Sequence, residues 1–299
     1  MSGALGIDIG GTGIKLAIVA DDGRPVETGR IPTDPDRDPE STVAAIAAAS
    51  APLVARFGKP RLRGVGVAVA GFIDSGRSHL EYNPNLHLLT GFPLRAAIEE
   101  ALDMPATLEV DSNAQAIAEY EFGAGKGARR LAFYSLGTGV GGGLLFDGEP
   151  LRFFGGCAGD MGHVIIDFDG PVCACGARGC LEAMVGRGRI EAKAGRPIED
   201  LLSKLRESNT DAMRIFEEVG HSVGLALAST VQLYGPDRYV VGGGLSLAGD
   251  VLFNSIRNTF RQVAAPPYRG LDIVEAAFGS FGGAIGAAVE WLRADGACR

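Results

Sequence analysis

Two glycine-rich turns, each placed between two apolar segments, constrain this chain more than any other feature of its sequence. Both turns contain Gly-Thr-Gly, centred on Thr12 and Thr138. The flanking apolar runs are 5–9, 14–20, 131–136 and 144–146. Runs rich in β-branched residues on either side of a glycine turn predict a β-hairpin. Because the pattern occurs twice, it predicts a structural duplication with one copy in each half of the chain.

The rest of the chain alternates between strand and helix patterns, which predicts an α/β fold class. The further predicted strands are 26–31, 62–70, 106–110, 238–241 and 271–275. The predicted helices are 39–57, 93–102, 112–122, 181–192, 198–206, 212–233, 249–262 and 282–293. From the repeat we expect an N-terminal lobe over 1–111, joined by the C-terminal segment 282–299, and a C-terminal lobe over 112–281.

The charge and hydropathy of the chain exclude several classes of protein. Its 299 residues carry a formal net charge of −8, which provides no positive surface to attract nucleic acid or an anionic membrane. The first residues lack the pattern of a targeting signal, and no later segment is apolar over the length of a bilayer. We therefore expect a cytoplasmic protein that binds a small molecule and has no nucleic-acid or membrane partner.

A glycine turn of this kind is suited to binding phosphate. Without Cβ atoms in the way, backbone N–H groups approach an oxyanion closely, and the threonine hydroxyl adds a further donor. Asp8 lies at the mouth of the first turn, where its carboxylate would repel phosphate unless Mg²⁺ bridged the two groups. A nucleotide with its magnesium ion is one interpretation of the two turns. Glycine that serves only the hairpin conformation is the other.

Neither turn matches a P-loop or a dinucleotide-binding signature. No Gly-Lys-Ser/Thr follows, and the G-x-G-x-x-G spacing over 137–142 precedes a predicted strand where a dinucleotide site requires a helix. A third glycine cluster, Gly242–Gly244, follows the predicted strand 238–241. It could accommodate a nucleotide base against the backbone, or merely turn the chain.

One segment has the spacing of a metal site. Its residues are His163, Cys173, Cys175 and Cys180. Three thiolates and one imidazole fill the tetrahedral coordination of zinc and leave no position for a substrate, so the pattern predicts a structural zinc ion. The five cysteines of the chain are an odd number and these three are too closely spaced for a disulfide framework. Thiols that bind no metal are the alternative.

Together these motifs resemble those of the ROK sugar kinases, a family of bacterial glucokinases, fructokinases, N-acetylhexosamine kinases and sugar-responsive repressors. The match runs nearly from end to end. Asp8–Thr12 and Gly137–Gly139 are similar to the two phosphate loops, Val241–Ser246 to the adenosine-side loop, and Ala158–Glu182 to the signature and zinc loop. The resemblance implies an actin-like (ribonuclease H-like), two-lobed kinase fold with a duplicated domain and ATP in a central cleft.

The resemblance also implies the reaction, which is ATP-dependent phosphorylation of a hydroxyl on a sugar or sugar-like molecule. The base in such kinases is the aspartate of an Asn-Asp-Ala-Asn segment, so Asp111 would accept the hydroxyl proton. From the sequence alone, capping of the following helix is the simpler role for Asp111. Asp8 would hold magnesium. The residues expected to bind ATP are Gly10, Gly11, Thr12, Gly137, Thr138, Gly139, Gly243 and Gly244. Those expected to bind the substrate are Gly71, Asp160, His163 and Glu182.

Several positions depart from the family pattern. Val110 stands where sugar-phosphorylating members usually have Asn, Asp160 replaces a Glu, and Leu89 replaces a common Trp. The strand end at Gly71 reads Val-Ala-Gly in place of Ala-Pro-Gly. Because a site built around substrate hydroxyls discriminates strongly among ligands, these changes predict an altered choice of acceptor. For Asp160 and Glu182, an ordinary solvated carboxylate is the alternative.

Two other functions are compatible with this fold. The first is a sensor that binds a sugar without phosphorylating it; we disfavour it because Asp111 is present and only 1–4 precede the first predicted strand, where family repressors carry a helix-turn-helix. The second is an actin-like ATPase that forms filaments or acts as a chaperone, which the zinc pattern disfavours. The resemblance further implies self-association as a homodimer or homotetramer.

Overall fold

The described part of the chain forms two compact units. The residues that the computed structural model describes are 2–83, 85–153, 156 and 160–296. The segments of unit 1 are 1–126, 143–159 and 280–299, and those of unit 2 are 127–142 and 160–279. The chain therefore enters unit 2 twice, and its C-terminal segment returns to unit 1. The lobe boundary expected at Asp111 stays a prediction.

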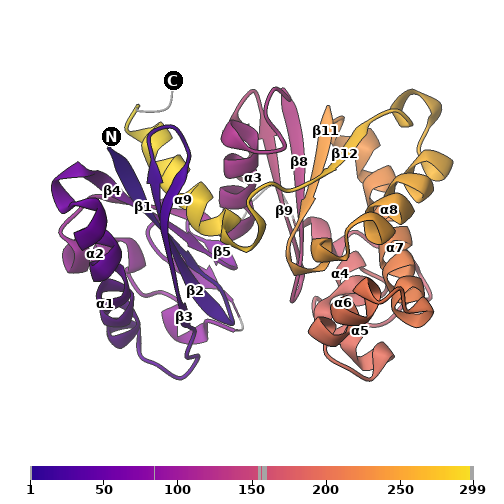
Figure 1. Ribbon diagram of the computed structural model, residues 1–299, viewed down its shortest axis with the longest axis horizontal. Coiled ribbons are helices and arrows are strands. Elements are labelled where there is room, and N and C mark those ends of the chain that lie inside the picture. The colour runs from indigo at the N-terminus through magenta and orange to yellow at the C-terminus, as the bar shows by residue number, and fades with distance from the viewer. Residues whose placement is uncertain (1, 84, 154–155, 157–159, 297–299) are drawn as a thin grey trace. The chain divides into compact units, whose positions relative to one another are not determined.

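A five-stranded sheet in the order β3-β2-β1-β4-β7 forms the centre of unit 1 (Figure 1). Its strands are β1 (Gly3–Ile9), β2 (Gly13–Ala20), β3 (Pro25–Pro32), β4 (Leu62–Val69) and β7 (Ala106–Val110). β1 and β2 form the antiparallel hairpin that the first glycine turn predicts, whereas β4 runs parallel to β1 and to β7. Almost every residue of β1, β2 and β4 is buried, because helices cover both faces of the sheet.

Four helices cover this sheet. They are α1 (Pro39–Phe57), α2 (Leu94–Leu102), α3 (Asp111–Phe122) and α9 (Gly282–Ala294). α1 and α2 pack on one face, and α3 and α9 on the other (Figure 1). α9 approaches the sheet very closely, since a Cβ on Gly6 or Gly66 would lie 1.8 or 1.7 Å from a carbonyl oxygen of α9. A small hairpin of β5 (Phe72–Ile73) and β6 (Leu80–Tyr82) completes the unit.

The second sheet repeats the strand order of the first, as β10-β9-β8-β11-β12. Its strands are β8 (Arg130–Leu136), β9 (Val140–Phe146), β10 (Glu149–Pro150), β11 (Arg238–Gly242) and β12 (Asp272–Glu275). β8 is the central strand, as β1 is in the first sheet. β9 and β10 lie on one side of it, as β2 and β3 do beside β1, and β11 and β12 lie on the other side, as β4 and β7 do. This shared order supports the duplication that the two glycine turns predict.

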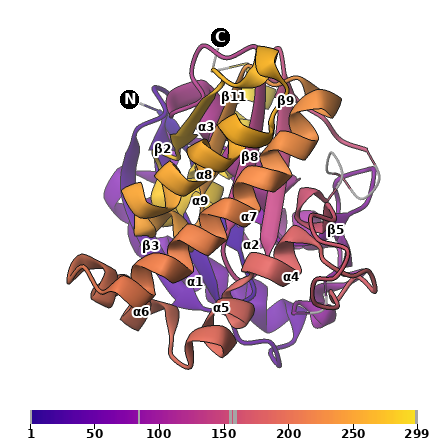
Figure 2. The ribbon, with the colours of Figure 1, turned by 90° about the vertical axis from the view of Figure 1, so that its right-hand side faces the viewer.

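Five helices belong to unit 2. They are α4 (Leu181–Val185), α5 (Arg187–Ala194), α6 (Ile198–Arg206), α7 (Thr210–Tyr234) and α8 (Asp250–Val263). α7 and α8 lie side by side (Figure 2). The buried Thr230 hydroxyl of α7 lies 3.1 Å from the Tyr134 hydroxyl and 3.0 Å from the Tyr239 hydroxyl. This polar group joins α7 to both β8 and β11.

Two of the predicted elements differ from the structure by more than their end residues. The helix predicted over 181–192 is interrupted at Gly186, whose φ of −59° and ψ of 145° are extended, so α4 and α5 are separate. The second glycine turn is shorter than predicted, because β9 already begins at Val140. Gly142 therefore lies in the strand, where a Cβ would come within 2.0 Å of the Met161 side chain. A larger residue at Gly142 would displace the end of the Met161 side chain, and this glycine is not part of the turn.

Candidate functional site

Three predicted site residues of unit 1 leave the sheet at one edge. The last residues of β1, β4 and β7 are paired in parallel register. Two of the predicted site residues follow a strand end directly, namely Gly10 after β1 and Asp111 after β7. The third, Gly71, follows the end of β4 after one further residue. Gly71 has a φ of +112°, and a Cβ there would lie 2.4 Å from the carbonyl oxygen of Tyr82. The carboxyl edge of parallel strands is where α/β sheets bind ligands.

The first glycine turn is compact and its tip is exposed. The Gly10 N–H donates to the Gly13 carbonyl at 3.2 Å, and the Thr33 hydroxyl donates to the Gly10 carbonyl at 2.6 Å. Gly11 and Thr12 are exposed at the tip. An oxyanion could therefore reach their backbone N–H groups, as the phosphate interpretation requires.

Asp8 is almost fully buried behind this turn, and Lys15 faces it. The Asp8 Oδ2 atom lies 3.3 Å from the Lys15 Nζ atom. Burial raises the pKa of Asp8, and the charge of Lys15 opposes that effect. A Cβ on Gly283, in the first turn of α9, would lie 2.7 Å from the same carboxylate. Sequence reasoning missed Lys15, although the register of the predicted hairpin pairs it with Asp8.

Asp111 is the first residue of α3, and its carboxylate is half-buried. The N-cap position belongs to Val110, so Asp111 does not cap the helix in the way that its position suggested. Its Oδ1 atom accepts from the N–H of Ser112 at 2.7 Å. Val110 is buried in unit 1, where a Cβ on Gly156 would lie 3.4 Å from its Cγ2 atom. Val110 thus places an apolar core side chain where the resemblance implies an asparagine.

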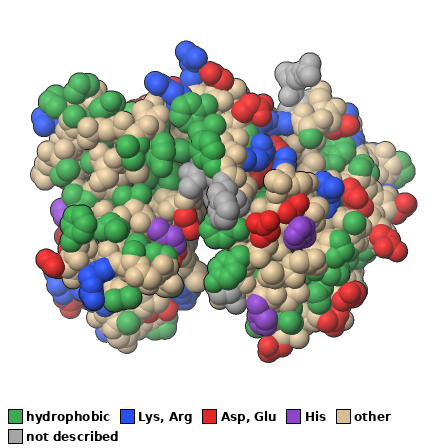
Figure 3. Space-filling view, turned by 180° about the vertical axis from the view of Figure 1, so that it is seen from behind, with side chains coloured by type: hydrophobic (Ala, Val, Ile, Leu, Met, Phe, Trp, Pro, Cys, Tyr) green, Lys and Arg blue, Asp and Glu red, His purple; other side chains and the backbone are tan. Residues whose placement is uncertain are grey.

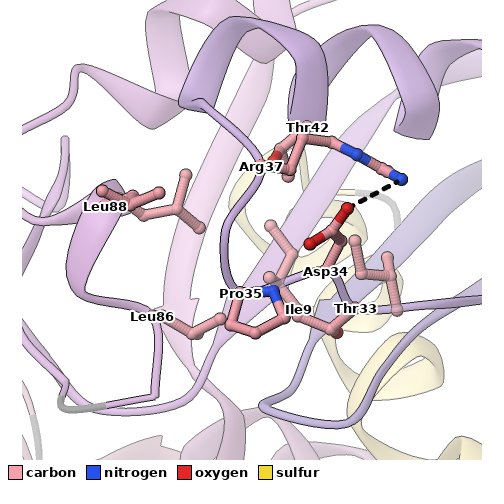
Figure 4. Close-up of a pocket in the computed structure, with 10 residues that line it drawn as sticks. Ile9, Thr33, Asp34, Pro35, Arg37, Thr42, Leu86 and Leu88 are labelled. Carbon is pink, nitrogen blue, oxygen red and sulfur yellow. Dashed lines mark ion pairs between the residues drawn. The ribbon is translucent and has the colours of Figure 1, made fainter.

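A small cavity lies beside the first turn (Figure 4). Its volume of about 20 Å³ is enough for a single water molecule. An ion pair of 3.6 Å between Asp34 and Arg37 lies at its wall. Leu89, the residue in place of the expected Trp, also lines the cavity and is buried.

In unit 2 the structure brings the second and third glycine clusters together. The Gly137 N–H donates to the Gly139 carbonyl at 2.9 Å, and the Gly137 carbonyl accepts from the Arg187 N–H of α5 at 3.1 Å. Gly243 has a φ of +90°, and a Cβ there would lie 2.2 Å from the carbonyl oxygen of Leu136. Only glycine therefore allows the loop at Gly243 to approach the strand end that precedes the tip.

The two predicted substrate carboxylates of unit 2 differ, because Glu182 is bound by the protein whereas the Asp160 side chain is exposed. Glu182 Oε2 accepts from the N–H of Val140 at 2.9 Å, and a Cβ on Gly139 would lie 2.3 Å from the same oxygen. Asp160 Oδ2 lies 3.3 Å from His163 Nε2. Burial raises the pKa of Asp160; the charge of His163 opposes this, and that of Glu182 adds to it. Asp160, His163 and Glu182 therefore form one cluster.

The four predicted zinc ligands converge. Their ligand atoms all lie within 4.8 Å of one another. His163 Nδ1 lies 3.4 Å from the Cys173 Sγ atom, and the Sγ atoms of Cys175 and Cys180 are 3.6 Å apart. Zinc–sulfur bonds of about 2.3 Å in a tetrahedron separate two thiolates by roughly 3.8 Å, so this set fits zinc. The imidazole would use Nδ1 for the metal, because its Nε2 atom faces Asp160.

Two residues of the predicted signature, Ala158 and Gly159, lie outside the described residues, and so do Cys157 and Cys298, for which the sequence predicts no role. In the part of the chain that is described, no helix combines the length and apolarity that a membrane span requires. On the face shown in Figure 3, acidic and basic side chains are interspersed with hydrophobic ones.

Comparison with known proteins extends these observations. The family model described as "ROK family" matches residues 4–294. The chain is 32% identical to the glucokinase of Streptomyces coelicolor, over 95% of this chain and 96% of that one. It is also 32% identical to the N-acetylmannosamine kinase of Escherichia coli, over 95% and 97%. The crystal structure of the ROK glucokinase of Streptomyces griseus, in complex with glucose and AMPPNP, has a TM-score of 0.84 at 29% identity, covering 96% of this chain and 98% of that one. The predicted actin-like fold is confirmed, and the chain belongs to the ROK family.

Proposed function

We propose that this protein transfers the γ-phosphoryl group of ATP to a hydroxyl of a sugar or sugar-like molecule. The observation that carries the proposal is the edge of unit 1, where Gly10, Gly71 and Asp111 follow neighbouring strands in register. Relatives named glucokinase and N-acetylmannosamine kinase match the chain over nearly its whole length, which supports the same reaction class.

Asp111 is the proposed general base. Phosphoryl transfer depends mainly on positioning and charge neutralisation, so the protein needs a carboxylate within hydrogen-bond reach of the acceptor hydroxyl. As the acceptor oxygen bonds to the γ-phosphorus, the bond from that phosphorus to the bridging oxygen of ADP breaks. The hydroxyl proton passes to the Asp111 carboxylate. Its place on the first turn of α3, at the carboxyl edge of the sheet, suits this role.

The two glycine tips are the proposed phosphate contacts. The exposed tip at Gly11 and Thr12 offers backbone N–H groups and a hydroxyl, and Gly137–Gly139 offers the equivalent groups in unit 2. The loop at Gly243 and Gly244 would lie against the nucleoside. A magnesium ion, when bound, neutralises phosphate charge, and the Asp8 carboxylate behind the first tip is the group that would hold it.

Three side chains of unit 2 are the proposed contacts to substrate hydroxyls. Asp160 and Glu182 offer carboxylate oxygens as acceptors, and His163 Nε2 lies beside Asp160. Zinc on the other nitrogen, Nδ1, would fix the orientation of this imidazole without contacting the substrate. The zinc ion is therefore proposed as a structural group that organises the acceptor side of the site.

The acceptor is expected to differ from that of an ordinary glucokinase. The buried Val110 side chain provides no hydrogen bond at a position where the family usually has an asparagine. Asp160 is shorter by one methylene than the glutamate it replaces. A hydroxyl that these family groups would bind loses partners here, and such losses discriminate strongly among substrates.

ATP turnover against a panel of acceptors tests the proposal. The panel contains hexoses, N-acetylhexosamines, sugar alcohols and nucleosides, each with the wild type, Asp111→Asn and the exposed control Asp36→Asn. We expect at least one acceptor to be phosphorylated, a loss of roughly a hundredfold or more in Asp111→Asn, and no loss in the control. Turnover of no acceptor, or an Asp111→Asn enzyme as active as the wild type, would contradict the mechanism.

Calorimetry with the same panel separates the kinase from the sensor. Sugar binding without turnover of any acceptor would favour the sensor over the kinase. Self-association as a dimer or tetramer stays a prediction, which light scattering of the purified protein tests.

A further inference from the structure

A cluster of four charged side chains inside unit 1 has no part in the mechanism above. Its members are Arg77, Glu109, Arg152 and Glu290. Glu109 is 1% exposed and Glu290 is 7% exposed. Arg152 Nη2 lies 2.6 Å from Glu109 and 2.8 Å from Glu290, and Arg77 Nη2 lies 3.2 and 2.9 Å from the same two carboxylates. Two positive and two negative groups thus form a neutral, largely buried network.

Stability alone is a weak reason for such a network. Removing charges from water costs free energy that their mutual attraction only partly returns, and apolar side chains of similar volume are often as stable. A buried network that binds several backbone segments does, however, fix those segments relative to one another. The segments that this network holds lie next to Asp111.

Glu109 holds the residues on either side of Asp111. One of its oxygens, Oε1, accepts from the Val110 N–H at 2.9 Å and from the Asn113 side-chain amide at 3.0 Å. Val110 comes directly before Asp111, and Asn113 follows two residues later. The Asn113 amide also donates to the Gly156 carbonyl at 2.9 Å. A single carboxylate oxygen therefore binds the end of β7 and the first turn of α3, with Asp111 between its two partners.

The other oxygen of Glu109 is bound by arginine. Oε2 accepts from Arg152 Nε at 2.8 Å and from Arg152 Nη2 at 2.6 Å, a two-pronged contact in which both N–H groups hold the same oxygen. Arg77 Nε donates to the Leu108 carbonyl of β7 at 2.7 Å. Glu290, which pairs with both arginines, lies on α9. Glu109 is thus held by two arginines from other parts of unit 1.

We propose that Glu109, oriented by Arg152, is a positioning residue that fixes the Asp111 carboxylate at the junction of β7 and α3. The inference rests on the proposed role of Asp111 as the base. Without the Glu109 carboxylate, the junction loses both hydrogen bonds of Oε1 and the Asp111 carboxylate shifts relative to the acceptor hydroxyl. Small misplacements of a reacting group cost large factors in rate.

Glu109→Gln is the direct test. The amide keeps the size of the side chain but directs N–H groups at donors of Arg152 or Asn113. We expect kcat to fall by roughly ten- to a hundredfold, with little change in KM for ATP, because the proposed ATP contacts lie in the glycine tips. The matched control is Glu119→Gln, since Glu119 is 2% exposed and accepts from the Ala124 N–H at the other end of α3. We expect the control to lower the melting temperature but not kcat.

A double-mutant cycle separates positioning from a general loss of structure. In an Asp111→Asn background, Glu109→Gln should cause no further fall in the residual turnover, while it lowers the melting temperature as much as in the wild type. Arg152→Lys keeps the charge but not the two-pronged contact, so it should show the same pattern with a smaller loss of kcat. This variant replaces Glu109→Gln in the test if Glu109→Gln does not fold. Equal fold losses of turnover in both backgrounds, wild-type kcat in Glu109→Gln, or the same kcat loss in the Glu119 control would overturn the inference and leave the proposed function in place. A fully active Asp111→Asn enzyme would overturn both.

Discussion

Asp74→Asn should destabilise unit 1 in a way that depends on pH. The Asp74 carboxylate closes the loop between β5 and β6. Its Oδ1 atom accepts from the N–H groups of Ser78 and His79 at 2.6 and 2.8 Å, and its Oδ2 atom from the Gly76 N–H and the Ser78 hydroxyl at 2.9 and 3.1 Å. Burial alone would raise the pKa of Asp74, but the hydrogen bonds from His79 and Ser78 lower it from 3.8 to about 2.

The size of the effect follows from this pKa. Each unit of difference between folded and unfolded chains corresponds to about 1.4 kcal/mol, so the carboxylate contributes about 2 kcal/mol to the free energy of unfolding at pH 7. Because the folded pKa is the lower one, the contribution is complete well above the unfolded value of 3.8 and is lost as the pH falls toward 2. About half of it should remain at pH 3. An asparagine does not titrate, so the difference between wild type and variant should follow this curve.

Urea unfolding of the wild type and Asp74→Asn, from pH 7 down to pH 3, measures that difference. Asp36→Asn makes the same change of charge at an exposed position, and its effect should stay within about 0.5 kcal/mol. A difference for Asp74→Asn that is independent of pH, or that grows as the pH falls, would refute the reasoning.

Two further predictions concern the zinc ligands and the packing of α9. Metal analysis of the purified protein should find zinc equimolar with the chain, and Cys180→Ser should remove it and lower the melting temperature, because only three ligands remain; a folded wild type without metal would contradict the assignment. Gly66→Ala should destabilise unit 1 by about 3 kcal/mol, since its Cβ would lie 1.7 Å from the carbonyl oxygen of Ala287. Gly188→Ala in α5, whose Cβ meets nothing within 4 Å, should leave stability unchanged or raise it slightly; equal melting temperatures for these two glycine variants would contradict the close packing of α9.

The features that the sequence predicts well are those specified locally. The helix 39–57 and the strand 106–110 have the predicted bounds, because apolar periodicity and a capping aspartate act within a few residues. Both glycine turns lie where they are expected. The interruption at Gly186 could not be predicted in the same way, since a glycine is also tolerated inside a helix.

The contacts that organise the site are mostly long-range. Arg152 and Glu290 are far from Glu109 in the sequence, and no periodicity links them to it. The contact between Glu182 and the second glycine tip likewise depends on how the zinc loop folds back. Asp111 could be placed at a strand end from the pattern, but its proposed role came from the resemblance. The identity of the acceptor follows neither from the sequence pattern nor from the resemblance. Val110 and Asp160 depart from the Asn and Glu that the resemblance implies, and neither residue indicates which hydroxyl is bound instead.

The return of α9 to unit 1 has a consequence for the order in which the protein folds during synthesis. The sheet strands of unit 1 are translated early, but the face of β1 and β4 that α9 covers stays uncovered until residues 282–294 have left the ribosome. Both segments of unit 2 are complete before that point. Although domains made first usually fold first, here the unit translated first is finished last, and its uncovered apolar strands must be kept from aggregating until the end of translation.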